Sequence, residues 1–119
     1  MKIQLMIGKL HQASVTQCDL HYQGSLTIDR DLLRRAGLYP HQKIDVYNIN
    51  TGARFSTYTL EGEAGSRVIG VNGAAARMCQ KGDRIIIVGF GEFEPHEAET
   101  HVPKVLVLDE NNGVVSEGH

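Results

Sequence analysis

Polar side chains interrupt segments of the chain that otherwise have the composition of β-strands. Lys9 and His11 lie in the first such segment, and Arg54 and Tyr58 lie in a later one. Lysine and arginine both bind carboxylates, and arginine can do so through two parallel hydrogen bonds. A tyrosine hydroxyl can donate a proton during catalysis. Each residue alone is more often an exposed charge or a half-buried strand residue, so spacing by itself selects no site.

A run of small residues after Asn72 is the second feature with chemical potential. Residues 73–76 are one glycine and three alanines, so Asn72 can cap a short helix that begins there. The backbone N–H groups of such a start are accessible, and they can bind an anion closely. The alternative for Asn72 is an ordinary helix cap that binds no ligand.

Other well-known catalytic and binding patterns are missing from the sequence. The chain has no GxGxxG or GxxxxGK[ST] loop for a nucleotide and no GxSxG elbow. His96 and His101 are one residue too far apart to share a helix face as a zinc motif requires. We therefore predict no metal site from the six histidines, which are His11, His21, His41, His96, His101 and His119.

The elements that must position these residues are predicted to be mainly β. Asp29 is expected to cap a helix over residues 30–36 that ends at Gly37, and a second short helix is expected over residues 73–77. Short strands with glycine-rich turns favour a barrel or a sandwich. The predicted strands span residues 3–16, 26–28, 43–50, 55–60, 67–71, 84–90 and 102–108. Residues from about 110 to 119 are polar and are predicted to form a flexible tail.

Length and charge limit the classes of function. The chain has 119 residues and a mass of 13.1 kDa, which predicts one domain over residues 1–119. Its formal net charge is −2, so the composition gives no sign of a basic surface that would bind nucleic acid or an anionic membrane. The chain has no tryptophan and few aromatic residues, so its core is expected to be aliphatic. The first apolar segment contains Gln4 and ends at Lys9, which is too short for a signal peptide and favours a cytoplasmic protein.

The segment His21–Asp29 contains Gly24-Ser25, which alone would be an ordinary turn. In context it resembles the processing site of the pyruvoyl-dependent aspartate decarboxylase family. The similarity covers the chain from Lys9 to about Pro103, and several motifs in the same order make it specific. They are Gly8-Lys9-Leu10-His11, Val15-Thr16, Asp19-Leu20-His21-Tyr22 with Gly24-Ser25, Thr51-Gly52-Ala53-Arg54-Phe55-Ser56-Thr57-Tyr58, Gly65-Ser66-Arg67 and Val71-Asn72-Gly73-Ala74-Ala75-Ala76. The family varies at the position of Leu26, and the tail from about Glu110 has no firm match.

The resemblance implies a double-psi β-barrel that forms a homotetramer with sites between neighbouring subunits. It also implies that the Ser25 hydroxyl attacks the Gly24 carbonyl while Thr57 assists the oxyanion. The chain would then become two pieces, 1–24 and 25–119, and residue 25 would become a pyruvoyl group. No metal and no pyridoxal phosphate are expected. Whether a helper protein assists this maturation stays open.

For turnover, the resemblance implies that L-aspartate forms a Schiff base with the pyruvoyl group and is converted to β-alanine and CO₂ for pantothenate biosynthesis. Tyr58 would return a proton to Cα, and Lys9 and Arg54 would bind the carboxylates. The remaining substrate-binding residues would be Thr57, Asn72, Gly73, Ala74 and Ala75, with His11 and Tyr22 as further lining residues.

Three alternatives remain at the level of sequence. A non-catalytic binding module with the same fold predicts no self-cleavage and no joint need for Arg54, Thr57 and Tyr58. A small nucleic-acid binder is disfavoured by the net charge of −2 and by the lack of a stripe of basic and aromatic residues. A decarboxylase for another acidic amino acid, such as glutamate, is not distinguished by two cationic residues.

Overall fold

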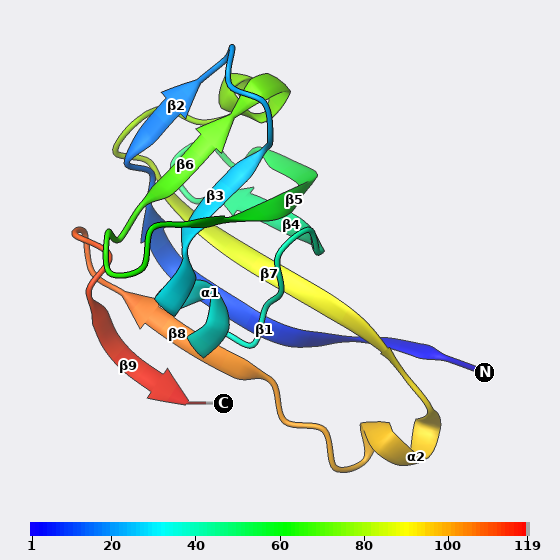
Figure 1. Ribbon diagram of the computed structural model, residues 1–119. Helices are drawn as coiled ribbons and strands as arrows, with labels where there is room; N and C mark the ends of the chain where they lie inside the picture. Colours follow the sequence, from blue (N-terminus) through cyan, green and yellow to red (C-terminus); the bar gives the residue numbers. More distant parts are fainter. Residues whose placement is uncertain (119) are drawn as a thin grey trace.

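The chain folds as one mixed β-sheet with three short helices, in a computed structural model that describes residues 1–118 (Figure 1). His119, which belongs to the predicted tail, lies outside the described residues. The strands are β1 Ile3–Ser14, β2 Gln17–Asp19, β3 Leu26–Asp29, β4 Lys43–Asn48, β5 Arg54–Gly62, β6 Ile69–Asn72, β7 Arg84–Phe93, β8 Lys104–Leu108 and β9 Val114–Gly118. The helices are α1 Arg30–Arg35, the 3₁₀ helix η1 Gly73–Arg77 and α2 Pro95–Ala98.

The order of strands in the sheet is β2-β6-β3-β5-β4-β7-β1-β8-β9. β1 and β7 are the longest strands and run antiparallel along most of their length, while β8 runs parallel to β1 on its other side. β3 lies between β5, to which it is parallel, and β6, to which it is antiparallel. The prediction of a mainly β chain with short helices is therefore confirmed.

The core is aliphatic, as the composition predicted. Leu10 of β1, Ile87 of β7 and Leu106 of β8 are fully buried, and each lies at an alternate position of its strand. The predicted hairpin is present as β4 and β5, which pair antiparallel from Lys43 opposite Tyr58 to Tyr47 opposite Arg54. The two faces of β5 differ, because Thr59 is buried whereas Arg54 and Tyr58 are exposed.

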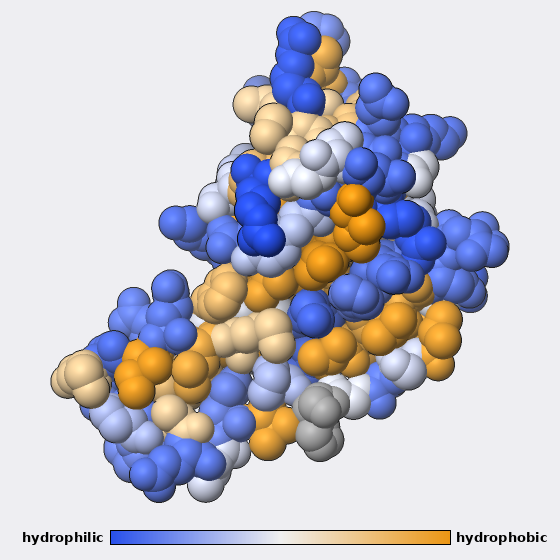
Figure 2. Space-filling model, turned by 180° about the vertical axis from the view of Figure 1, so that it is seen from behind, coloured by the Kyte–Doolittle hydropathy of each residue, from blue (hydrophilic) through white to orange (hydrophobic). Residues whose placement is uncertain are grey.

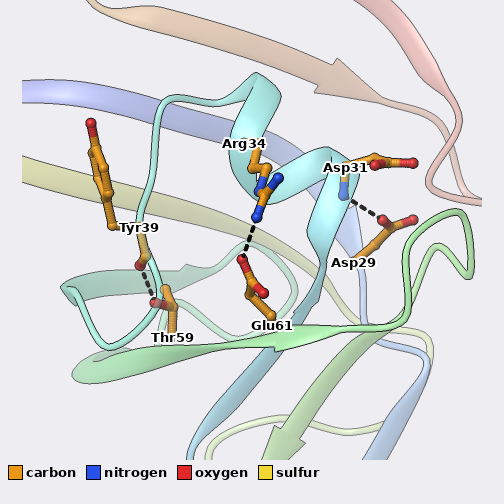
Figure 3. Close-up of polar contacts among 6 residues, drawn as sticks. All are labelled: Asp29, Asp31, Arg34, Tyr39, Thr59 and Glu61. Atoms are coloured by element: carbon orange, nitrogen blue, oxygen red, sulfur yellow. Dashed lines mark hydrogen bonds and ion pairs between the residues drawn. The ribbon is translucent and has the colours of Figure 1, made fainter.

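The predicted cap of α1 is confirmed (Figure 3). The Asp29 carboxylate accepts a hydrogen bond from the backbone N–H of Asp31 at 2.8 Å. Gly37 follows the helix with φ of 73°, a left-handed conformation that ends helices and favours glycine. Figure 3 also shows the Arg34 guanidinium turned toward the Glu61 carboxylate of β5, at 3.5 Å, so that α1 is tied to the sheet.

Three elements differ from the sequence prediction. β2 and α2 were not predicted, and β9 forms in the segment for which an irregular tail was predicted. β9 pairs antiparallel with β8, and the turn between them is held by the Asp109 carboxylate, which accepts backbone hydrogen bonds from Asn111 and Gly113 at 2.8 Å each. In residues 1–118, none of the helices is long and apolar enough to cross a membrane.

Candidate active site

The Gly24–Ser25 peptide lies directly before β3, at the end of the loop that leads from β2. Gly24 has φ of 99°, a left-handed conformation that residues with a side chain rarely adopt. Both residues are half-buried, whereas Tyr22 earlier in the loop is 53% exposed. The fold thus holds the Gly24–Ser25 peptide, in a conformation that favours glycine, directly before a strand whose later residues are in the core.

Asn72, the last residue of β6, lies opposite Ser25. Its backbone N–H donates to the Ser25 carbonyl at 2.7 Å, which continues the antiparallel pairing of Leu26 with Val71. The Asn72 side chain is fully buried, and its Nδ2 donates to the Thr27 hydroxyl at 3.2 Å. The carboxamide oxygen Oδ1 has no hydrogen-bond partner among residues 1–118. The predicted cap is therefore wrong in one respect, because the Asn72 side chain forms no capping bond to η1.

Thr57 and Tyr58 lie on β5, directly before the part of that strand that pairs with β3. β3 and β5 are parallel, with Leu26 opposite Thr59. A Cβ at Gly24 would meet the Leu60 side chain, so the Gly24–Ser25 peptide lies against β5. Tyr58 is 44% exposed, so its hydroxyl is free to meet a small molecule at this end of β3.

The small residues after Asn72 lie against the loop that carries Gly24 and Ser25. Gly73 has φ of 61°, and a Cβ there would lie 3.5 Å from the carbonyl oxygen of Tyr22. Ala74 is exposed and Ala75 is buried, at the start of η1. The structure thus brings Tyr22, the Gly24–Ser25 peptide and the start of η1 together at one end of β3 and β6.

A second group of predicted residues lies on other strands. Lys9 of β1 is opposite Val88 of β7, and Val88 is opposite Asp45 of β4. Asp45 is in turn opposite Ser56 of β5. In the order of the sheet, β7 and β4 therefore lie between Lys9 on β1 and β5, and β3 lies on the far side of β5.

Arg54 stacks on an aromatic ring that sequence reasoning missed. Its guanidinium carbon lies 4.3 Å from the centre of the Tyr47 ring, directly across the β4–β5 hairpin. Such a contact holds a guanidinium in a fixed plane while its N–H groups stay free for a carboxylate. The hairpin was predicted without a pairing register, and the register is what makes Tyr47 the cross-strand neighbour of Arg54.

His11 has an environment that keeps its ring uncharged. Burial lowers the pKa of His11 below its ordinary value of 6.5, and the nearby positive charges of Lys9 and Arg84 lower it further. Its Nδ1 is buried and has no hydrogen-bond partner among the residues that the structure describes. His11 lies two residues from Lys9 on β1, on the same face of the strand, and so belongs with the second group.

The histidines of residues 1–118 take part in no cluster that could hold a metal ion. His101, part of the near-miss zinc motif, places its Nε2 at 2.7 Å from the Met6 carbonyl oxygen. Its ring packs against Phe93 with 4.3 Å between ring centres. Its role in the structure is therefore to fix the segment after α2 against β1 and β7.

Comparison with known proteins identifies the family of this chain. The family model described as aspartate decarboxylase matches residues 1–115. The aspartate 1-decarboxylase of Maricaulis maris is 56% identical over 116 residues, which cover 98% of this chain and 96% of that protein. Those of Phenylobacterium zucineum and Thermoanaerobacter pseudethanolicus are 54% and 51% identical, over 96% and 94% of this chain and 97% and 96% of their own lengths. The chain therefore belongs to the aspartate decarboxylase family.

Proposed function

We propose that the protein is a pyruvoyl-dependent aspartate 1-decarboxylase, a lyase that converts L-aspartate to β-alanine and CO₂ and supplies β-alanine for pantothenate biosynthesis in the cytoplasm. Membership of the family supports the activity. The observation that carries the proposal is the Gly24–Ser25 peptide, which has a left-handed glycine and lies against the buried Asn72. A peptide held in this way is suited to attack on its own carbonyl.

Self-cleavage at this peptide requires that the Ser25 hydroxyl reach the Gly24 carbonyl carbon. The attack replaces the peptide C–N bond with an ester bond, and Thr57 would stabilise the oxyanion that forms on the way. Elimination then releases the carboxylate of Gly24 and leaves dehydroalanine at position 25. Addition of water and loss of ammonia convert dehydroalanine into a pyruvoyl group, so the products are the pieces 1–24 and 25–119.

The residues around position 25 fit such a group. Asn72 offers an unpaired oxygen inside the protein, and Gly73 leaves space for close approach of the backbone. When present, the pyruvoyl group supplies an electrophilic carbonyl that accepts the electrons released as CO₂ leaves.

The chain's own residues then bind the substrate and move the proton. Tyr58 is placed to return a proton to Cα, and Lys9 and Arg54 bind the two carboxylates. Asn72 orients the reacting group, and backbone groups of Gly73, Ala74 and Ala75 hold the substrate. Thr57, His11 and Tyr22 line the site.

We further propose a double-psi β-barrel that assembles into a homotetramer with sites between subunits. Lys9 on β1 lies four strands along the sheet order from β3, which supports a site that takes this cation from a neighbouring subunit. Large apolar side chains, such as Ile49 and Val102, are exposed in the single chain. Figure 2 shows apolar residues gathered across the middle of one face, as expected of a surface that contacts another subunit.

Denaturing mass spectrometry tests the proposal directly. After warm incubation the wild-type protein should appear as two fragments instead of one chain of 13.1 kDa. Ser25→Ala should stay intact and release no CO₂ from aspartate, whereas Ser66→Ala, in an exposed turn, should behave as wild type. Cyanoborohydride reduction with aspartate present should add the substrate to the 25–119 fragment. Release of CO₂ by Ser25→Ala would exclude the pyruvoyl mechanism, and faster release from glutamate would reassign the substrate.

A further inference from the structure

Thr27 is a half-buried threonine on β3 that neither the motifs nor the proposed mechanism uses. It lies two residues after Ser25, so the two side chains lie on the same face of the strand. Its neighbours Leu26 and Ile28 are fully buried in the core on the other face. The Thr27 hydroxyl is therefore directed toward the side of β3 on which the chemistry at residue 25 would take place.

The only side-chain partner of Thr27 within residues 1–118 is Asn72. The Asn72 Nδ2 donates to the Thr27 Oγ1 at 3.2 Å, and the Asn72 backbone N–H donates to the Ser25 carbonyl at 2.7 Å. Asn72 is thus connected to β3 at two points, one through its backbone and one through its carboxamide. The two bonds link Ser25, Asn72 and Thr27 into a single hydrogen-bonded unit.

The bond to Thr27 decides which edge of the Asn72 carboxamide is left free. The side chain is fully buried, and Oδ1 has no hydrogen-bond partner in the described part of the chain. A buried acceptor without a partner is unfavourable, and native proteins retain one mainly where a ligand or reacting group completes it. With Nδ2 held by Thr27, Oδ1 is the edge that remains to accept a hydrogen bond.

We propose that Thr27 is a positioning residue for self-cleavage and turnover. It holds the Asn72 carboxamide through Nδ2, so that Oδ1 stays free to accept a hydrogen bond from the reacting group at residue 25. This inference rests on the proposed function, since it assigns a role at the same site. Without the Thr27 hydroxyl, the carboxamide loses its only side-chain partner and can rotate.

Thr27→Val removes the hydroxyl with little change in shape and should slow both self-cleavage and kcat on the order of tenfold, with little change in KM. Thr27→Ser keeps an oxygen at the same position and should restore both rates. Thr16→Val is the matched control, because the half-buried Thr16 hydroxyl bonds to the backbone of Ile69 on β6, at 3.1 and 3.0 Å, away from Asn72. It should lower the melting temperature at least as much as Thr27→Val and leave both rates unchanged.

A double-mutant cycle tests whether Thr27 acts through Asn72. In an Asn72→Ala background, Thr27→Val should have no further effect on the cleavage rate or on kcat. An equal loss in both backgrounds would overturn the proposal, as would wild-type rates in a folded Thr27→Val protein.

A third measurement does not depend on activity. In the Ser25→Ala chain, which cannot cleave, NMR should show slow hydrogen exchange of the Asn72 carboxamide protons, and Thr27→Val should make that exchange fast. Unchanged exchange would overturn the role of Thr27 whatever the enzyme does. If the wild-type protein failed to cleave or to release CO₂, that result would count against the proposed function. The hydrogen-exchange measurement would still test whether Thr27 holds the Asn72 carboxamide.

Discussion

Tyr58 is the proton donor that we propose for turnover; it directly precedes Thr59, the partner of Leu26 on β5, and it is 44% exposed. We predict that Tyr58→Phe cleaves at the normal rate but loses about 10²-fold or more in kcat, since only turnover needs the phenolic proton. Fragment masses and CO₂ release measure the two steps separately. Tyr39→Phe, at a tyrosine that is 69% exposed, is the control and should match wild type. Normal turnover by Tyr58→Phe would assign the proton to another donor.

His11 gives the protein a predictable response to acid. Its pKa is lowered below 6.5, so the unfolded chain binds this proton more readily than the folded chain. The stability that neutral His11 contributes is therefore present above pH 6.5 and is lost as the pH falls below it. We predict that the unfolding free energy falls less steeply from about pH 7 to about pH 5.5 in His11→Gln than in wild type. An NMR titration that places the pKa of His11 at or above 6.5 would contradict the prediction.

Individual residues show where sequence reasoning about the site stopped. Residue types alone gave Lys9, Arg54 and Tyr58 as candidates, and the resemblance brought in Gly24 and Ser25. Sequence placed Asn72 at a helix start, as observed, but it predicted a cap where the structure has a bond to β3. That bond joins residues 45 positions apart, and no local pattern reports such a contact. Thr27 was not among the predicted site residues for the same reason.

At the scale of elements, Asn112 explains why the C-terminal segment is a strand. Its Oδ1 accepts from the Ser14 N–H at 2.7 Å, and its Nδ2 donates to the carbonyls of Ser14 at 2.9 Å and Arg67 at 3.0 Å. The turn before β9 is thus tied to the end of β1 and to the β5–β6 connection. The Asn-Asn-Gly sequence correctly indicated a turn, but the partners of Asn112 lie far away in the chain.

Asn112→Ala removes three hydrogen bonds from a side chain that is only 1% exposed. We predict that it lowers the unfolding free energy of the Ser25→Ala precursor by about 2 kcal/mol or more, because the backbone N–H and carbonyl of the buried Ser14 and the carbonyl of Arg67 lose their partner. Urea unfolding at fixed protein concentration measures this loss. Asn111→Ala, at an exposed neighbour whose bond to Asp109 uses the backbone, should change stability little. Equal stability of both variants would mean that Asn112 does not anchor β9.

The main elements were predictable from hydropathy, because β1 largely alternates between apolar and polar residues and β7 contains a continuous apolar run. The β4–β5 hairpin and α1 were likewise predictable, the second from Asp29 and Gly37 at its ends. β2 has three exposed residues and α2 has four residues without a buried one, so neither carries a hydropathy signal. β2 forms because it pairs with β6, and α2 begins with a capping box between Glu94 and Glu97. Both features become visible only in the folded chain.

For the whole molecule, the two groups of site residues predict complementation between chains. Lys9→Ala and Tyr58→Phe should each be poorly active, but tetramers that contain both should regain activity, because some sites then combine an intact Lys9 with an intact Tyr58. Co-expression followed by a CO₂-release assay measures this. A mixture of Lys9→Ala with the double variant Lys9→Ala/Tyr58→Phe is the control and should stay inactive. No recovery in verified mixed tetramers would place both residues of each site in one chain.

The position of β1 has a further consequence for the lifetime of the protein. β1 lies between β7 and β8, and in the proposed mature form it belongs to the 1–24 piece, which is no longer covalently joined to either neighbour. The precursor folds as a single chain, whereas the cut protein would need two pieces to meet again after unfolding. Unfolding in dilute solution then becomes practically irreversible, because the small piece diffuses away. The mature enzyme would therefore stay folded because its activation barrier to unfolding is high, and each molecule would fold productively only once.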